Sequence, residues 1–186
     1  MTDIEFDRDI GLRIMIDTNV INSRGRDADM NQLEAWGCTG VIDIVLSEPA
    51  HEEATADHDP RRVAKANTHV ISESLARTTE ERRILDTIAQ TIFPSVVPNR
   101  NQANDIEIVF NSWKYGAILV TNDGDSRSQP RGILGSRAEL EKLAIRVMRP
   151  SEAVTEVRQK IAVRDSIARQ SSESHGCAPP AWVGND

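Results

Sequence analysis

The sequence predicts an α/β fold, a three-layer α/β/α sandwich with a central parallel sheet of about four to five strands. Two observations indicate this class. Short apolar runs rich in β-branched residues, which are typical of buried strands, alternate with longer stretches in which apolar residues recur at helical spacing. Such alternation gives parallel strands with helices on both faces of the sheet. Ligands of such sheets bind beyond the carboxyl ends of the strands, so we expect a functional site there.

Four apolar runs predict the strands. Gly11 precedes the first run and the turn-forming sequence Asp17-Thr18-Asn19 follows it. The third run follows Gly116 and ends at the polar sequence TNDGD. The runs are residues 12–16 (LRIMI), 41–46 (VIDIVL), 117–120 (AILV) and 145–148 (IRVM). Residues 95–97 (SVV), enclosed by two prolines, are a candidate for a short connecting strand.

Helical spacing predicts the segments between these runs. Ser47 suits an N-cap and Pro49 the first turn of a helix, where a missing N–H costs little. From there to residue 92 the pattern is helical, with a break at residues 58–60. Further helices are expected from near residue 33, at residues 101–115, at 137–142, and from 150 to about 170. The polar remainder, residues 171–186, has the composition of a tail.

The chain of 186 residues is long enough for one domain with its own core. We expect an α/β domain at residues 1–155, in which about residues 55–100 form an enlarged helical segment, and a C-terminal helix and flexible tail at residues 156–186. The acidic N-terminus and the short apolar runs predict neither a signal peptide nor a membrane span. We therefore expect a cytoplasmic protein, in which Cys38 and Cys177 are free thiols.

Acidic residues follow three of the predicted strands. Asp17 comes directly after the first strand, Asp123 shortly after the third, and Glu53 lies in the helix that follows the second. Asp105 joins them if the first turn of its helix faces the same edge of the sheet. The sequence therefore predicts a cluster of carboxylates at the carboxyl ends of the strands.

Crowded carboxylates raise one another's pKa unless a positive charge neutralises them. A ligand set of oxygen atoms alone favours Mg²⁺ or Mn²⁺ over zinc, and such ions commonly act on phosphoryl groups. A bound metal ion polarises a phosphate and lowers the pKa of its water. Phosphodiester hydrolysis is the reaction class that follows. The net charge of −7 argues against loose, charge-driven binding of nucleic acid, but a local acidic cluster is what a cation site requires.

Five stretches of the chain resemble PIN-domain proteins. Together they extend from about residue 12 to residue 155, apart from the segment between about 55 and 100. Their order and spacing are more specific than any one motif. The stretches are residues 14–20 (IMIDTNV), 40–54 (GVIDIVLSEPAHEEA), 104–116 (NDIEIVFNSWKYG), 117–125 (AILVTNDGD) and 146–153 (RVMRPSEA).

The resemblance implies a PIN-like nuclease domain at residues 1–155 and a site for Mg²⁺ or Mn²⁺ that cleaves RNA. The four acids match the family's metal-binding positions, and Asp125 matches a further metal contact. Supporting positions match the residues beside them. The implied catalytic and metal-binding residues are Asp17, Glu53, Asp105 and Asp123, and the supporting residues are Asn19, Ser47, Thr121 and Asn122.

Three glutamates, Glu48, Glu52 and Glu53, lie near the expected metal-site glutamate. Glu53 is favoured because it keeps the small apolar residues of its helix, Ala50 and Ala54, on the core side. Alternatives for function also stay open: a VapC-like toxin of a toxin–antitoxin pair, and a catalytically silent PIN-like module that binds RNA or protein. The chain is longer than compact toxins of the family, so the resemblance supports nuclease chemistry more directly than toxin behaviour.

The expected partners are an RNA substrate and, for a toxin, an antitoxin-like inhibitor protein; a homodimer is also compatible with the sequence, and no membrane is expected. Basic residues on a predicted helix and after the Asp123 turn are candidates for contacts with the phosphate backbone. The alternative reading is a solvated surface. These residues are Arg61, Arg62, Lys65, Arg127, Arg131 and Arg137.

Overall fold

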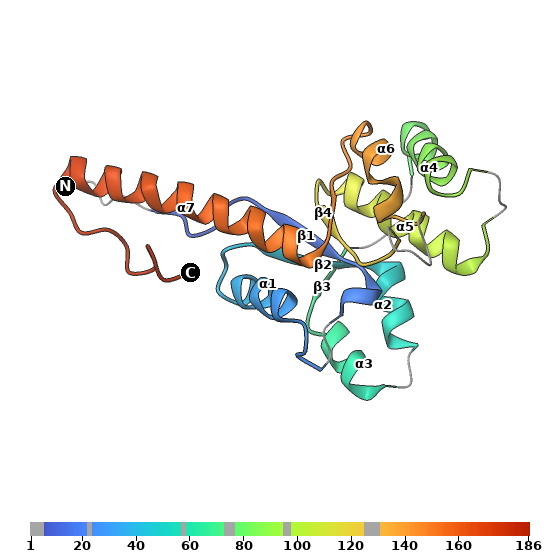
Figure 1. The fold of residues 1–186 in the computed structure, drawn as a ribbon, viewed down its shortest axis with the longest axis horizontal. Helices are drawn as coiled ribbons and strands as arrows, with labels where there is room; N and C mark the ends of the chain where they lie inside the picture. Colours follow the sequence, from blue (N-terminus) through green and yellow to red (C-terminus); the bar gives the residue numbers. More distant parts are fainter. Residues whose placement is uncertain (1–5, 22–23, 57–58, 73–76, 95–97, 125–130) are drawn as a thin grey trace.

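The computed structural model describes residues 6–21, 24–56, 59–72, 77–94, 98–124 and 131–186. Its central sheet has five parallel strands in the order β3-β2-β1-β4-β5. Helices cover both faces of the sheet (Figure 1). The predicted three-layer α/β/α class is confirmed.

The strand β1 lies at the centre of the sheet. Ile14 of β1 pairs with Ile44 on one side and with Ile118 on the other. Three of the four residues of β1 are fully buried, because helices cover both faces there. The strands are β1 (Arg13–Ile16), β2 (Asp43–Ser47), β3 (Val70–Ser72), β4 (Ile118–Val120) and β5 (Val147–Met148).

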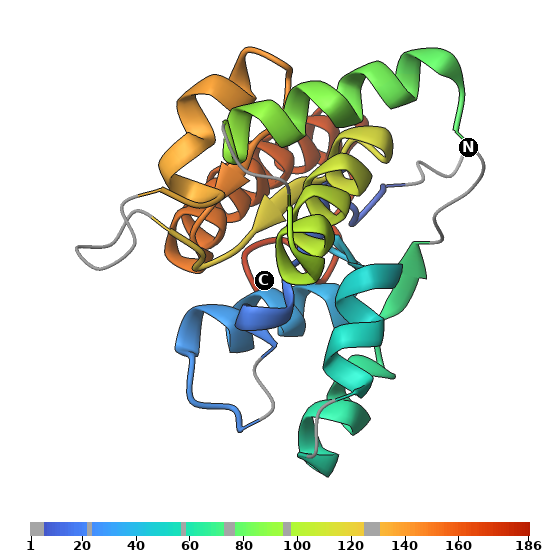
Figure 2. The ribbon, with the colours of Figure 1, turned by 90° about the vertical axis from the view of Figure 1, so that its right-hand side faces the viewer.

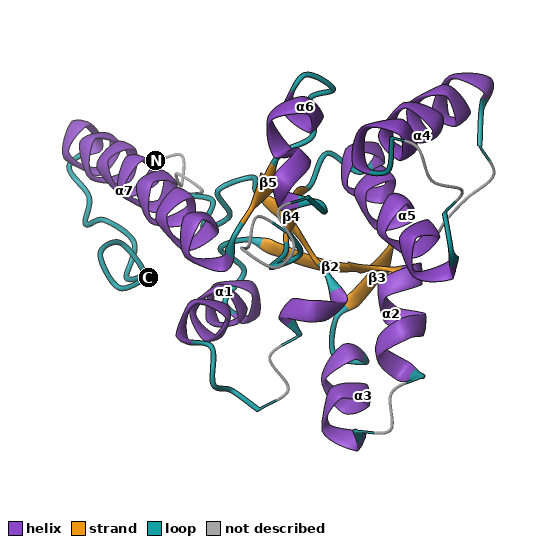
Figure 3. Cartoon of the chain, turned by 45° about the vertical axis from the view of Figure 1, so that its right-hand side comes forward, coloured by secondary structure: helices purple, strands orange, loops and turns teal. Residues whose placement is uncertain are grey.

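Figure 3 shows α1 and α7 on one face of the sheet and α4, α5 and α6 on the other, with α2 and α3 beside the β3 edge. The helices on the first face are α1 (Ala28–Cys38) and α7 (Pro150–His175). Those on the second face are α4 (Thr79–Ile92), α5 (Arg100–Lys114) and α6 (Arg137–Glu141). At the edge lie α2 (Glu48–Thr55) and α3 (Pro60–Ala66), and two 3-10 turns, η1 (Thr18–Val20) and η2 (Leu134–Ser136), follow β1 and precede α6.

The expectation of one helical region between residues 48 and 92, interrupted only at residues 58–60, is wrong in one respect. The chain leaves the helical path a second time and forms β3, which pairs with β2 through Val45 and Val70. β3 has only three residues, and Val70 is 68% exposed. The strand is therefore too short and too exposed to give the pattern of apolar residues by which a strand is predicted from sequence. Backbone pairing with β2 creates this strand. The predicted connecting strand at residues 95–97 lies outside the described residues.

The helix expected from near residue 33 begins earlier, at Ala28. Asp27 caps it, because the Asp27 side chain accepts hydrogen bonds from the amides of Asp29 and Met30, each at 3.0 Å. Because the residues of this first turn are mostly polar, the spacing of apolar residues does not indicate that the helix begins there.

The C-terminal segment departs from the expected tail. Helix α7 continues to His175 and ends at Gly176, whose φ of +64° lies in the left-handed region that favours glycine. In Figure 1, α7 extends well beyond the sheet and the chain then turns back along it. The Trp182 ring lies 4.3 Å from the guanidinium of Arg164. Residues 176–186 therefore have a defined path, because their few anchoring side chains find partners on α7.

No helix in the described part of the chain is long and apolar enough to cross a membrane.

Candidate active site

Asp17 lies at the carboxyl end of β1 and is 4% exposed. Its backbone amide donates to the carbonyl of Val120 at 3.0 Å, which continues the pairing of β1 with β4. Its Oδ1 accepts a hydrogen bond from the amide of Thr18 at 2.6 Å, so Asp17 caps the η1 turn. The backbone at the end of β1 therefore positions this carboxylate.

Two side chains hold the other oxygen of Asp17. The Thr121 hydroxyl donates to Asp17 Oδ2 at 2.6 Å, and the Asn19 amide donates to the same atom at 2.7 Å. Asn19 also donates to Thr121 Oγ1 at 3.1 Å and accepts from the backbone amide of Asn122 at 3.0 Å. The predicted supporting residues Asn19, Thr121 and Asn122 are thus together beside Asp17, Asn122 through its backbone.

Asp123 is held by a tight turn after β4. Its backbone amide donates to Thr121 Oγ1 at 2.9 Å, and its Oδ2 accepts from the amide of Ile133 at 2.9 Å. Gly124 and Gly132 both have positive φ, and a Cβ at either position would collide with the facing turn, at Gly132 with the Asp123 carboxylate itself. Two glycines are therefore required for the chain to close around Asp123.

Glu53 reaches the same edge from α2. Ser47 caps this helix, with its hydroxyl accepting from the amide of Ala50 at 3.4 Å. Ala50 and Ala54 are buried on the core side, as expected. The Thr18 hydroxyl donates to Glu53 Oε2 at 3.2 Å, so Glu53 contacts the residue next to Asp17.

Of the three candidate glutamates, Glu53 is the one whose charge acts on both Asp17 and Asp105. Glu48 opens the helix, and Glu52 and Glu53 are both exposed, so the contact of Glu53 with Thr18 is what distinguishes it. The geometry therefore favours the register deduced from the small residues of α2.

Helix α5 brings Asp105 to the edge, where it is partly buried. In Figure 2, η1, α2 and the first turns of α5 lie next to one another in front of the sheet. We call the four carboxylates Asp17, Glu53, Asp105 and Asp123 the acidic edge.

Electrostatic repulsion links the members of the acidic edge. Burial raises the pKa of Asp105 to about 7, and the negative charges of the other three carboxylates add to the shift. Burial also raises the pKa of Asp17 to about 6, although hydrogen bonds from Thr121 and Thr18 oppose the shift. The Asp105 side chain has no hydrogen bond or ion pair with a described residue. Among the described residues, neither the Asp17 nor the Asp105 side chain forms an ion pair with a basic residue.

The donor set suits a hard cation, because every candidate ligand is a carboxylate oxygen. Within the described ranges, no three acidic, histidine or cysteine side chains are close enough together to hold one ion. Mg²⁺ is commonly bound through only one or two carboxylates, with water and phosphate oxygens completing its shell. The chemistry therefore fits Mg²⁺ or Mn²⁺, while coordination by all four acids stays a prediction. Asp125 lies outside the described residues.

Basic side chains lie close to the acidic edge. Arg62 donates to the carbonyl of Thr18 at 2.7 Å. Arg131 is exposed, and it lines one cavity together with Asp123. Lys65 instead pairs with Glu34 at 2.7 Å, and Arg137 pairs with Glu152 at 3.0 Å. Arg127 lies outside the described residues.

The sequence-based reasoning missed one residue of the site and undervalued another. Thr18 contacts Asp17, Glu53 and Arg62, and its only signal was its place between two predicted site residues. Gly132 follows a proline and an arginine in a polar loop, where a glycine is ordinary. Its requirement becomes evident only from the closeness of Asp123.

Comparisons with known proteins add a similarity of fold. No protein-family model matches the sequence, and no curated protein sequence matches it. The structure is similar to that of VapBC2 from Rickettsia felis bound to a DNA fragment from their promoter. The match covers 74% of this chain and 98% of that chain, with 15% sequence identity and a TM-score of 0.48. A likeness at this level concerns the path of the chain and assigns no function.

Proposed function

We propose that this protein is a metal-dependent endoribonuclease of the PIN-like type, which hydrolyses RNA phosphodiester bonds. The observation that carries the proposal is the acidic edge, four carboxylates delivered by four separate elements to one end of the sheet. Burial and the neighbouring negative charges raise the pKa of Asp17 and of Asp105, and neither of these side chains forms an ion pair with a described residue. Such an arrangement costs stability, and perturbed pKa values of this kind gather at functional sites.

The residues of the acidic edge would hold Mg²⁺ or Mn²⁺, which supplies positive charge and a more acidic water when bound. The chain's own contribution is orientation. The Thr121 hydroxyl and the Asn19 amide fix Oδ2 of Asp17, and the Ile133 amide fixes Oδ2 of Asp123. Arg131, which lines the cavity beside Asp105 and Asp123, would pair with a substrate phosphate. Attack by water needs no covalent intermediate, and the structure is compatible with that route.

The test is cleavage of a mixed RNA pool in Mn²⁺ by the wild type, by Asp17→Asn and by Asp43→Asn. Asp43 is an exposed carboxylate at the opposite end of β2, so its variant is the matched control. We expect Asp17→Asn to lose more than about 100-fold in rate and Asp43→Asn to match the wild type.

Equal rates for Asp17→Asn and the wild type would overturn the proposal. So would the absence of cleavage by the wild type with any RNA or DNA. A catalytically silent module, the alternative from a different class, would bind RNA without cutting it, and the same assay separates the two.

A further inference from the structure

A cavity of about 310 Å³ opens directly beside the acidic edge, with Asp105 and Asp123 in its wall. The end of α4 and the turn after it supply an apolar side, Ile92, Phe93 and Pro94. Gln102 of α5 and Arg131 supply polar groups. The cavity is thus apolar on one side and charged on the other, next to the site of the proposed chemistry.

We infer that this cavity receives one unpaired base of a single-stranded RNA, beside the phosphodiester bond that the acidic edge cleaves. The inference rests on the proposed function and deepens it by naming the substrate class. It commits the protein to a substrate whose bases are accessible, because a base stacked and paired in a duplex reaches such a pocket only after leaving the helix.

The size of the cavity suits one nucleotide unit. Binding pockets for small molecules begin at about 300 Å³, so a cavity of about 310 Å³ holds one base with part of its sugar. The position adds a second constraint. Any occupant lies against Asp105 and Asp123, so the base it accepts belongs to a nucleotide close to the cleaved bond.

The apolar side can stack with a base. Phe93 is only partly buried, since it packs on the edge of the core while its ring lines the cavity. Pro94 beside it is exposed, and Ile92 forms the buried floor. Stacking of bases on aromatic rings tolerates any sequence, because every base has a π face.

The polar side offers one group for the base and one for the backbone. Gln102 Oε1 accepts from the amide of Asn99 at 3.0 Å, and the Gln102 amino group has no partner among the described residues. It is therefore able to donate to an acceptor on the edge of a base. Arg131 is exposed and forms no ion pair with the described residues. It is therefore able to pair with a phosphate group, which the neighbouring carboxylates would otherwise repel.

The test is the affinity of a 5′-labelled, mixed-sequence 12-nucleotide RNA, measured by fluorescence anisotropy in EDTA. Phe93→Leu keeps an apolar side chain and removes the ring, and we expect it to weaken binding by about 5- to 100-fold. Phe93→Trp retains a ring and is expected to stay within about twofold of the wild type. The control is Phe6→Leu, the same exchange in a different cavity, which should leave the affinity unchanged.

A duplex of the same sequence should show no difference between Phe93→Leu and the wild type. In Mn²⁺, single abasic substitutions on either side of the cleavage site should raise the KM of the wild type at one position. The same substitution should have little further effect in Phe93→Leu, because the ring and the base act as a pair.

The outcomes separate the two proposals. If Phe93→Leu binds single-stranded RNA as the wild type does, and cleavage still depends on Asp17, the base pocket is wrong and the nuclease stands. If Phe93→Leu loses affinity but no protein cleaves RNA, the pocket stands and the nuclease is wrong. Should Phe93→Leu fold poorly, photo-crosslinking of a 4-thiouridine RNA to the wild type decides. Adducts are expected at Phe93, Pro94 or Gln102, and adducts elsewhere alone would overturn the inference.

Discussion

Two groups of acids in this protein differ in the charge of the groups that surround them. At the acidic edge, Asp17 accepts hydrogen bonds from neutral groups only, and its pKa is raised to about 6, chiefly by burial. Along α7, Arg164 donates to Asp165 and to Asp186, in each case at 2.7 Å. Arg8 pairs with Asp186 as well. We call Arg8, Arg164, Asp165 and Asp186 the terminal ion-pair cluster.

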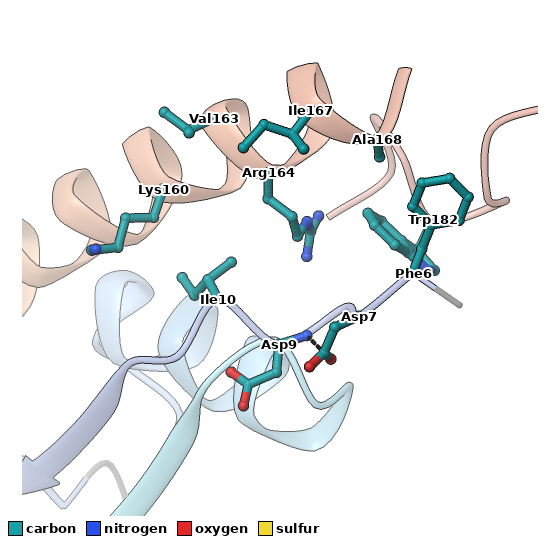
Figure 4. A pocket seen from close by; sticks show the side chains of 10 residues that line it. All are labelled: Phe6, Asp7, Asp9, Ile10, Lys160, Val163, Arg164, Ile167, Ala168 and Trp182. Atoms are coloured by element: carbon teal, nitrogen blue, oxygen red, sulfur yellow. Dashed lines mark hydrogen bonds between the residues drawn. The ribbon is translucent and has the colours of Figure 1, made fainter. Parts of the chain in front are cut away.

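The pKa of Asp186 is lowered. Burial acts to raise it, but the hydrogen bonds and charges of Arg8 and Arg164 outweigh that effect. Figure 4 shows the Arg164 side chain extending from α7 toward the N-terminal segment, in the cavity that also contains Phe6 and Trp182. In the terminal ion-pair cluster, arginines therefore neutralise the buried carboxylates.

The two groups therefore differ in whether their buried carboxylates have arginine partners. The cavity that Arg164 lines is larger than the one beside the acidic edge, about 450 Å³ against about 310 Å³. The buried acids of the terminal ion-pair cluster, however, are paired with arginines. At the acidic edge, Asp17 and Asp105 form no ion pair with a described residue, so their burial destabilises the fold. A buried acid that no described basic residue neutralises is thus a better indication of function than the volume of a cavity.

The largest effect on stability is expected at the terminal ion-pair cluster. Arg164→Leu leaves Asp165 and Asp186 buried without their shared arginine, and should lower the free energy of unfolding by about 3 kcal/mol. For a chain of 186 residues, this corresponds to a fall in Tm of about 6 to 12 °C. Calorimetry measures it, with the exposed Arg158→Leu on the same helix as control. Cleavage by the folded fraction should be retained; its loss would show that the two regions are not separate.

An intermediate effect is expected from pH. The pKa values of Asp17 (about 6) and Asp105 (about 7) lie above the ordinary 3.8. At pH values between the ordinary pKa and these raised pKa values, the folded protein therefore binds more protons than the unfolded chain. Its free energy of unfolding should fall as the pH rises from about 4 to about 7. Asp186, with its lowered pKa, acts in the opposite sense, and its stabilisation is lost as the pH falls below about 4.

Urea denaturation in EDTA across this pH range measures the effect. Asp105→Asn should show a shallower decline than the wild type, because it removes one of the two groups. Mn²⁺ should restore stability at pH 7 in the wild type, by about 2.7 kcal/mol at a concentration 100 times its Kd. Identical pH profiles for the wild type and Asp105→Asn would contradict the assignment of Asp105 to the acidic edge.

The smallest effect is expected at Thr121. Thr121→Val keeps the shape of the buried side chain but removes the hydroxyl that donates to Asp17 and accepts from the amide of Asp123. Loss of such an orienting contact should lower kcat/KM by about 10- to 100-fold. Thr121→Ser should recover most of the activity. A Thr121→Val protein as active as the wild type would mean that Asp17 needs no fixed orientation.

Much of the acidic edge could be predicted because its signals are local. Asp17 follows an apolar strand directly, and Asp123 follows another within a few residues. Parallel strands end at the same edge, so topology alone joins these positions. The register of Glu53 followed from Ala50 and Ala54, which are buried as their spacing indicates. The position of Asp105 was conditional, because it depends on how α5 packs.

The sequence by itself determined the fold class, the ends of the main strands and the residue types of a cation site, since each is encoded within a few neighbouring residues. Only the tertiary structure decided the rest. β3 exists through pairing with β2, and the cavity beside the acidic edge joins residues of α4, α5 and the turn at Gly132. Arg8 and Asp186 meet across 178 positions of the chain. Contacts between residues far apart in the chain decide whether an arginine or another carboxylate lies next to a buried carboxylate. This difference distinguishes the terminal ion-pair cluster from the acidic edge.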